Sequence, residues 1–60
     1  MPTYEFDRYV RGVKMAEGAR ITKATTDAEA LAMARSLFAE SYNQEEMDRT
    51  KFVLVSVFEN

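Results

Sequence analysis

The chain has no cysteine and no histidine among its 60 residues. Without cysteine, no disulfide can brace the fold and no thiolate can bind a metal. Without histidine, the commonest general base and metal ligand are missing, which excludes nucleophilic triads and Cys–His pairs. Two glycines are too few for a phosphate-binding loop or a dinucleotide-binding fingerprint. The sequence therefore contains no residue set typical of a common active site, and no cofactor is expected.

The length of the chain limits its stability. A single domain over residues 1–60 buries only about 60% of the surface that its unfolded form exposes. Small proteins usually add disulfides, a metal or a partner chain. Because only the partner remains here, we expect a homo-oligomer or a small subunit bound to a larger protein.

The composition is ordinary for a folded domain, with 47% apolar and 30% charged residues. No stretch approaches the eighteen or so apolar residues of a membrane span, so no membrane association is expected. Residues 1–5 lack a basic region followed by an apolar core, which is the pattern of a signal peptide. The expected location is therefore the cytoplasm.

A β-hairpin is predicted at the start of the chain. Residues 4–10 are aromatic-rich and alternate, which predicts a strand with Tyr4 and Phe6 on one face. Arg11-Gly12 offers a two-residue turn, because glycine accepts a positive φ without steric cost.

The second strand is predicted over about residues 13–24, with Gly18 interrupting it. A glycine inside a strand often marks a bulge. Because a bulge changes the face of every later residue, either Ile21 or Thr22 can point inward.

The clearest local signal is a helix start. Thr26 followed by Glu29 is a capping box, and Asp27 suits the positive end of the helix dipole. Apolar residues then recur at helical spacing on one face, namely Ala30, Leu31, Ala34, Leu37 and Phe38. We expect the helix to end near 41–43 at Asn43, and the polar connection that follows has room for one more helical turn.

The last strand, predicted over residues 52–58, is apolar on both faces. Strict alternation places Phe52, Leu54 and Phe58 on one face and three valines on the other. A strand of this kind expects cover on both sides, and one helix covers only one face of a sheet. We therefore predict an interface, most simply with a second copy, formed by Val53, Val55 and Val57 with Tyr9 and Met15.

Together these elements predict an α+β fold, a ββαβ unit with a three-stranded sheet in the order 2-1-3 and one amphipathic helix packed on one face. The right-handed crossover makes the second and third strands parallel, with the first antiparallel to both. The leading functional hypothesis is a non-catalytic protein–protein interaction module. It either self-associates or acts as a small accessory or regulatory subunit of a larger protein, with phage-type inhibitors as a sub-case.

A second hypothesis is a module that binds single-stranded nucleic acid. Basic residues lie among the aromatic residues of the first half, namely Arg8, Arg11, Lys14, Arg20 and Lys23. Such a surface can stack bases and contact phosphates. The net charge of −2 opposes this reading, so nucleic acid is not the expected partner.

A third hypothesis is an enzyme that uses Pro2. Removal of Met1 would expose a proline amine, which can act as a general base with arginines such as Arg8 and Arg11 nearby. The N-terminus is similar to that of short tautomerases of about this length, but in that family the first strand leads directly to a helix, whereas a hairpin is predicted here.

A cluster of carboxylates after the helix, Glu45, Glu46 and Asp48, is the remaining candidate for chemistry. Three carboxylates can hold a hard cation, but their spacing is not that of a calcium loop. No metal is therefore expected.

Overall fold

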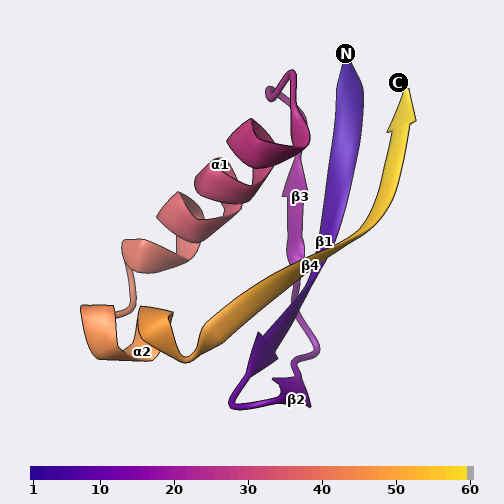
Figure 1. Ribbon diagram of the computed structural model, residues 1–60. Coiled ribbons are helices and arrows are strands. Elements are labelled where there is room, and N and C mark those ends of the chain that lie inside the picture. Colours follow the sequence, from indigo (N-terminus) through magenta and orange to yellow (C-terminus); the bar gives the residue numbers. More distant parts are fainter. Residues whose placement is uncertain (60) are drawn as a thin grey trace.

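A computed structural model describes residues 1–59 as a sheet with a helix across one face (Figure 1). Its elements, in chain order, are β1 (Pro2–Val10), β2 (Val13–Lys14), β3 (Ala19–Ile21), α1 (Asp27–Ala39), α2 (Gln44–Asp48) and β4 (Thr50–Glu59). The central strand β1 pairs antiparallel with β2 and β3 on one side and with β4 on the other. The predicted α+β class and the central place of the first strand are confirmed.

The β1–β2 turn is the predicted two-residue hairpin. Arg11 and Gly12 both have positive φ, 54° and 82°, and Val10 pairs with Val13 across them. Positive φ at both central residues is the geometry of a type I′ turn, whose twist matches that of the flanking strands.

The predicted second strand is not continuous, because it is interrupted between β2 and β3. Tyr9 pairs with Lys14, and Phe6 pairs with Ala19. Between these two pairs, the chain has four residues on the side of Lys14 and Ala19 but only two residues on β1. Gly18 ends the interruption, with its backbone directly against the carbonyl of Phe6.

The number of extra residues determines which side chains of β3 point toward the core. Two extra residues leave the alternation of side chains unchanged, whereas one would invert it. Ile21 lies opposite Tyr4 and is buried, and Thr22 is exposed.

Helix α1 begins at the predicted cap. The Thr26 hydroxyl accepts from the Glu29 backbone N–H at 3.1 Å. The Glu29 carboxylate accepts from the N–H of Thr25 at 2.7 Å, one residue earlier than in a standard capping box. The helix ends at Ala39, earlier than predicted.

Asn43 does not end α1 as predicted; it begins α2. Its side chain accepts from the Glu46 N–H at 2.8 Å, and the Glu46 carboxylate accepts from the Asn43 N–H at 3.0 Å. This is a capping box. The further helical turn for which the sequence left room is thus present, and it buries Met47.

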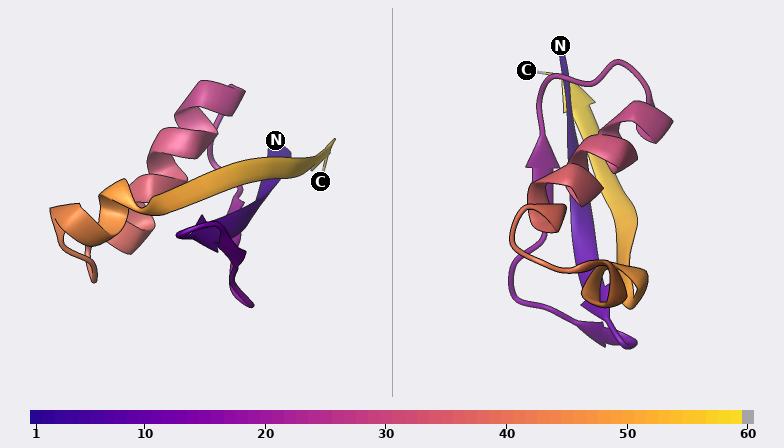
Figure 2. Two further views of the ribbon diagram at one scale, coloured as in Figure 1. Left: turned by 60° about the horizontal axis from the view of Figure 1, so that its bottom comes forward. Right: turned by 90° about the vertical axis from the view of Figure 1, so that its left-hand side faces the viewer.

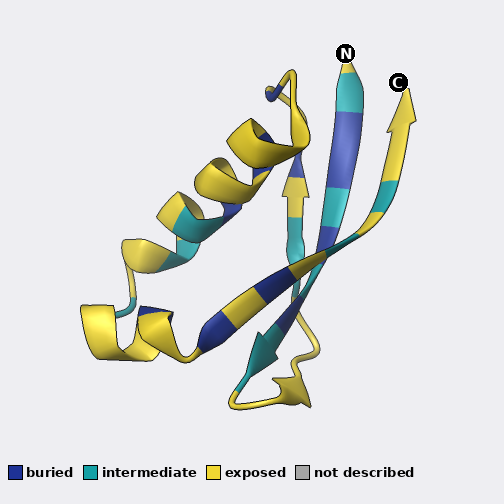
Figure 3. Cartoon of the chain, in the orientation of Figure 1, coloured by how far each residue is buried: buried dark blue, intermediate teal, exposed yellow. Residues whose placement is uncertain are grey.

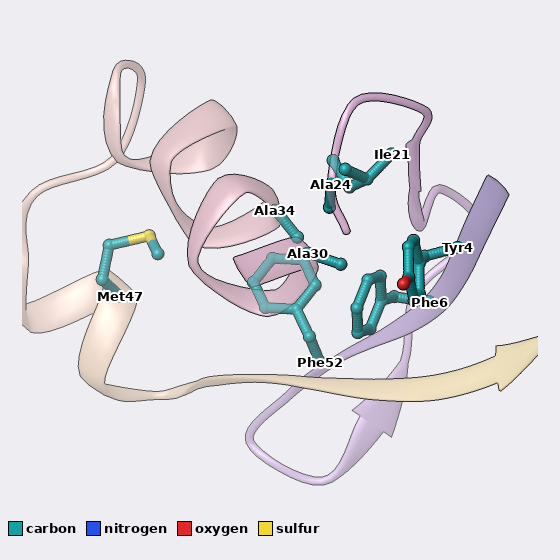
Figure 4. Packing of buried hydrophobic residues seen from close by; sticks show 8 residues of the cluster. All are labelled: Tyr4, Phe6, Ile21, Ala24, Ala30, Ala34, Met47 and Phe52. Atoms are coloured by element: carbon teal, nitrogen blue, oxygen red, sulfur yellow. The ribbon is translucent and has the colours of Figure 1, made fainter. Parts of the chain in front are cut away.

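Helix α1 lies across one face of the sheet, as Figure 2 shows from two sides, and the buried side chains lie between the two. Ala30 and Ala34 are fully buried, and their small side chains let the helix backbone approach the strands. Phe52 packs edge-on against Phe6, with ring centroids 6.4 Å apart, and against Phe38 at 5.4 Å. The buried cluster (Figure 4) consists of Tyr4, Phe6, Ile21, Ala24, Ala30, Ala34, Met47 and Phe52.

An irregularity in β4 changes which of its side chains meet the core. Ser56 lies opposite Glu5 and Leu54 lies opposite Phe6, so Val55 has no partner of its own on β1. One extra residue of this kind is a β-bulge, and it inverts the alternation beyond it.

The bulge corrects the predicted faces of the last strand. Val57 lies opposite the buried Tyr4, on the side of the sheet that α1 covers. Phe58 lies opposite Thr3, on the other side. The predictions that Val57 shares a face with Val53 and that Phe58 shares a face with Phe52 are therefore wrong.

The contact at Gly18 predicts that Gly18→Ala destabilises the fold. A Cβ there would overlap the Phe6 carbonyl oxygen, and that backbone is held in the sheet. We expect a loss of about 1–3 kcal/mol in the free energy of unfolding, measured by urea denaturation. The neighbouring exposed change Glu17→Ala is the control, and equal stability of the two variants would contradict the contact.

Tyr4 provides a prediction about pH. Burial raises the pKa of its hydroxyl, and repulsion from Asp27, Glu29 and Glu59 raises it further. The folded state therefore keeps Tyr4 protonated where an unfolded tyrosine ionises, at about pH 10. Stability is unaffected below that pH and falls as pH rises through the folded pKa. In an absorbance titration of the tyrosines, Tyr4→Phe should remove the ionisation that occurs at the highest pH. If the variant instead lacks an ionisation that occurs at lower pH, the prediction is contradicted.

Candidate functional site

The side of the sheet opposite α1, called here the open face, has no helix over it within residues 1–59 (Figures 1 and 2). Its apolar part lies along β4. Val53, Val55 and Phe58 are 37%, 54% and 44% exposed, and we call these three residues the β4 strip. Val55 belongs to this face because it borders a shallow hollow together with Glu5 and Arg20.

The rest of the open face is polar. Arg20 donates two hydrogen bonds to the Glu5 carboxylate, at 2.6 and 3.0 Å. The Lys14 ammonium lies 3.5 Å from the Asp7 carboxylate. The expectation of an apolar uncovered face therefore holds only for the β4 half, since β1, β2 and β3 contribute ion pairs.

The predicted interface residues do not form one surface. Tyr9, Val53 and Val55 lie on the open face, because Tyr9 pairs with Lys51 and Asp7 pairs with Val53. Val57 lies on the α1 side, as the register shows. Met15 also lies there, beside Arg8 and Tyr42 in a hollow at the end of the sheet.

Helix α1 exposes apolar residues, of which the sequence analysis placed Leu31 and Leu37 on the core-facing side of the helix. Leu31, Met33 and Leu37 are each at least 36% exposed, and Figure 3 shows the outer side of α1 exposed along its length. Met33 and Leu37 border a groove of about 450 Å³ between α1 and β3. The signal was present in the sequence: α1 carries only three charged residues, so its outer side has little charge.

The five basic residues proposed for nucleic acid lie on separate surfaces. Lys14 and Arg20 are ion-paired on the open face. Arg11 occupies the β1–β2 turn, and Lys23 borders the groove beside α1. Because Arg8 is buried, no continuous basic stripe results.

Arg8 is held in an aromatic setting. Its Nε–H donates to the Glu17 carbonyl at 3.0 Å and its Nη1 to the Tyr42 hydroxyl at 3.3 Å. Its guanidinium lies over the Phe38 ring, 4.5 Å from the centroid, which is a cation–π contact. The alternation of β1 did place Arg8 on the core face, but its aromatic partners come from α1 and the segment after it.

The residues of the proline hypothesis are not brought together. Pro2 pairs with Glu59 at one end of the sheet, and Arg8 and Arg11 lie at the other end of β1. Arg8 lies six positions after Pro2 along an extended strand, which separates them by about 20 Å.

The acidic residues of α2 have structural partners. Glu45 pairs with Arg49 at 3.1 Å, Glu46 caps α2, and Asp48 accepts from the Gln44 amide at 2.7 Å. Within residues 1–59, no three side chains of the types that bind metals are grouped closely enough to hold an ion. No helix in this range has the length and apolar character needed to cross a membrane.

Comparison with known proteins finds no matching family, no matching curated protein and no matching solved structure.

The scattered basic residues predict weak contact with nucleic acid. We expect no saturable binding of a single-stranded oligonucleotide at physiological salt, because Lys14 and Arg20 are neutralised and the five basic residues form no continuous stripe along which a strand could lie. Fluorescence anisotropy over a range of salt concentrations measures this. Saturable binding that weakens steeply with ionic strength would contradict the prediction and favour the nucleic-acid hypothesis.

Proposed function

We propose that this chain is a non-catalytic protein-interaction module that associates through the β4 strip on the open face. Its partner is a second copy of the chain or, when it acts as an accessory subunit, a larger protein. The proposal rests on the strip itself, three large exposed apolar side chains on a face without a helix, with Ser56 between Val55 and Phe58. Cytoplasmic location stays a prediction from the sequence.

The balance of buried and exposed apolar side chains supports an interface. Among residues 1–59, ten large apolar side chains are at least 36% exposed, whereas only five are buried, alanines excluded. Soluble monomers seldom expose large contiguous apolar patches, and such patches usually mark binding sites. A chain with this balance gains stability when a partner covers part of that surface.

The bulge favours contact through the face of β4 over contact through its edge. Within residues 1–59, β4 pairs only with β1 and is therefore an edge strand. An irregular edge pairs poorly with another strand, and a bulge is a common device against such pairing. Because Val55 interrupts the pairing of β4 with β1, addition of a further strand along β4 is disfavoured. A partner would therefore contact the side chains of β4 and not its backbone edge.

The ion pairs beside the strip suit self-association. An interface usually has an apolar centre and a polar rim. On the open face, acidic Glu5 and Asp7 belong to the central strand, and basic Lys14 and Arg20 lie outside them. A surface with both signs in ordered positions can complement a second copy of itself across a two-fold axis.

Val55→Asp tests the strip. Val55 is more than half exposed, so the variant should fold, but it would place a charge in the contact. We expect light scattering at micromolar concentration to give an associated wild type and a monomeric variant with unchanged circular dichroism. Val55→Thr, which is close in shape, should weaken association less.

Leu37→Asp is the matched control. Leu37 on α1 has the same exposed fraction, 54%, as Val55 but lies away from the open face. It should associate like the wild type. A wild type that is a stable monomer without a partner, or loss of association in Leu37→Asp alone, would overturn the proposal.

A further inference from the structure

A hollow of about 290 Å³ lies at the end of the sheet where the β1–β2 turn meets α2, at the lower end in Figure 1. Two backbone hydrogen bonds shape it. The Arg11 N–H donates to the Arg49 carbonyl at 3.1 Å, and the Met15 N–H donates to the Arg8 carbonyl at 2.8 Å. Three arginines border the hollow, Arg8, Arg11 and Arg49, and we call it the arginine pocket.

The charge of Arg8 is not balanced within the protein. Only 5% of this residue is exposed, and a guanidinium stays ionised in proteins. Among residues 1–59, no carboxylate forms an ion pair with it. A buried charge without a counter-charge is costly, so an anion that reached it would be bound favourably.

One edge of the Arg8 guanidinium is available for a ligand. Its Nε and Nη1 have protein acceptors, but Nη2 has none within residues 1–59. Every fully buried side-chain nitrogen or oxygen in that range has a hydrogen-bond partner. Nη2 is therefore not sealed in the core, and the arginine pocket is the hollow that Arg8 borders.

Tyr42 adds a second donor. Tyr42 also borders the pocket, and its hydroxyl accepts from Arg8, so the hydroxyl proton is free to be donated. In the described part of the chain no acceptor for that proton lies within hydrogen-bonding distance. Phe38 covers a flat face of the Arg8 guanidinium, which restricts ligand contact to the N–H edge.

The rim of the pocket carries more positive than negative charge. Arg11 and Arg49 border it, although Arg49 also pairs with the Glu45 carboxylate at 3.1 Å. Glu46 is the one acidic residue on the rim, and its carboxylate already accepts from the Asn43 N–H. With the Arg49 charge offset by Glu45, Arg8 and Arg11 are the cations among these lining residues that no printed ion pair within residues 1–59 neutralises.

We propose that the arginine pocket binds a small oxyanion, a phosphate or carboxylate group, held by the Arg8 Nη2 edge and the Tyr42 hydroxyl with Arg11 and Arg49 at the rim. Arginine edges suit the paired oxygens of both groups. The pocket lies on the α1 side of the sheet and the β4 strip lies on the other side. The proposed anion site therefore does not depend on the proposed interface, and each can be tested without the other.

The test is an NMR titration of isotope-labelled full chain with inorganic phosphate and, separately, with sodium acetate, at ionic strength held constant with chloride. We expect saturable shifts in the amides of the β1–β2 turn and of Met15 and Thr50, which surround the pocket. Arg11→Gln and Arg49→Gln, both at exposed positions, should each weaken the apparent affinity by about fivefold.

Arg20→Gln on the open face is the matched control and should leave the affinity unchanged. Saturation with only one of the two anions supports the site and identifies its ligand. Shifts that do not saturate, or that weaken equally in Arg20→Gln, would show general charge screening and overturn the proposal.

Discussion

The structure depends on one constraint: a single helix covers a single face of the sheet. α1 approaches the strands through two alanines, and the aromatic side chains of β1 and β4 fill the space beneath it. With no cysteine in the chain, no disulfide supplements this one-sided core. A core of this size leaves a 60-residue domain marginal, which is why the surfaces outside it matter for both stability and function.

The bulge at Val55 divides β4 between these two roles. Before it, Phe52 and Leu54 face α1 and belong to the core or pack against it. At and beyond it, Val55 and Phe58 lie on the open face, with Val53 beside them. The same irregularity disfavours strand pairing at the edge, so one extra residue both builds the β4 strip and limits how a partner can meet it.

Local signals in the sequence predicted the hairpin turn and the start of α1, because each depends on neighbouring residues, and the general rule for crossover connections led to the central place of β1. The bulge could not be predicted, since no glycine marks Val55 and the run of valines reads as regular alternation. The prediction that Asn43 ends α1 was wrong because asparagine is favoured both at the end of a helix and at the cap that begins one, and here it begins α2. The pairing of Arg8 with Tyr42 is a contact across 34 residues that no local pattern encodes.

We propose that a second copy of the chain covers apolar surface that α1 leaves exposed on the sheet. The thermal unfolding midpoint of the purified chain, measured as a function of its own concentration, tests this proposal. If copies associate in the folded state only, the midpoint rises with concentration by mass action. A midpoint that stays constant over a hundredfold range of concentration, with a monomeric mass throughout, would contradict this proposal.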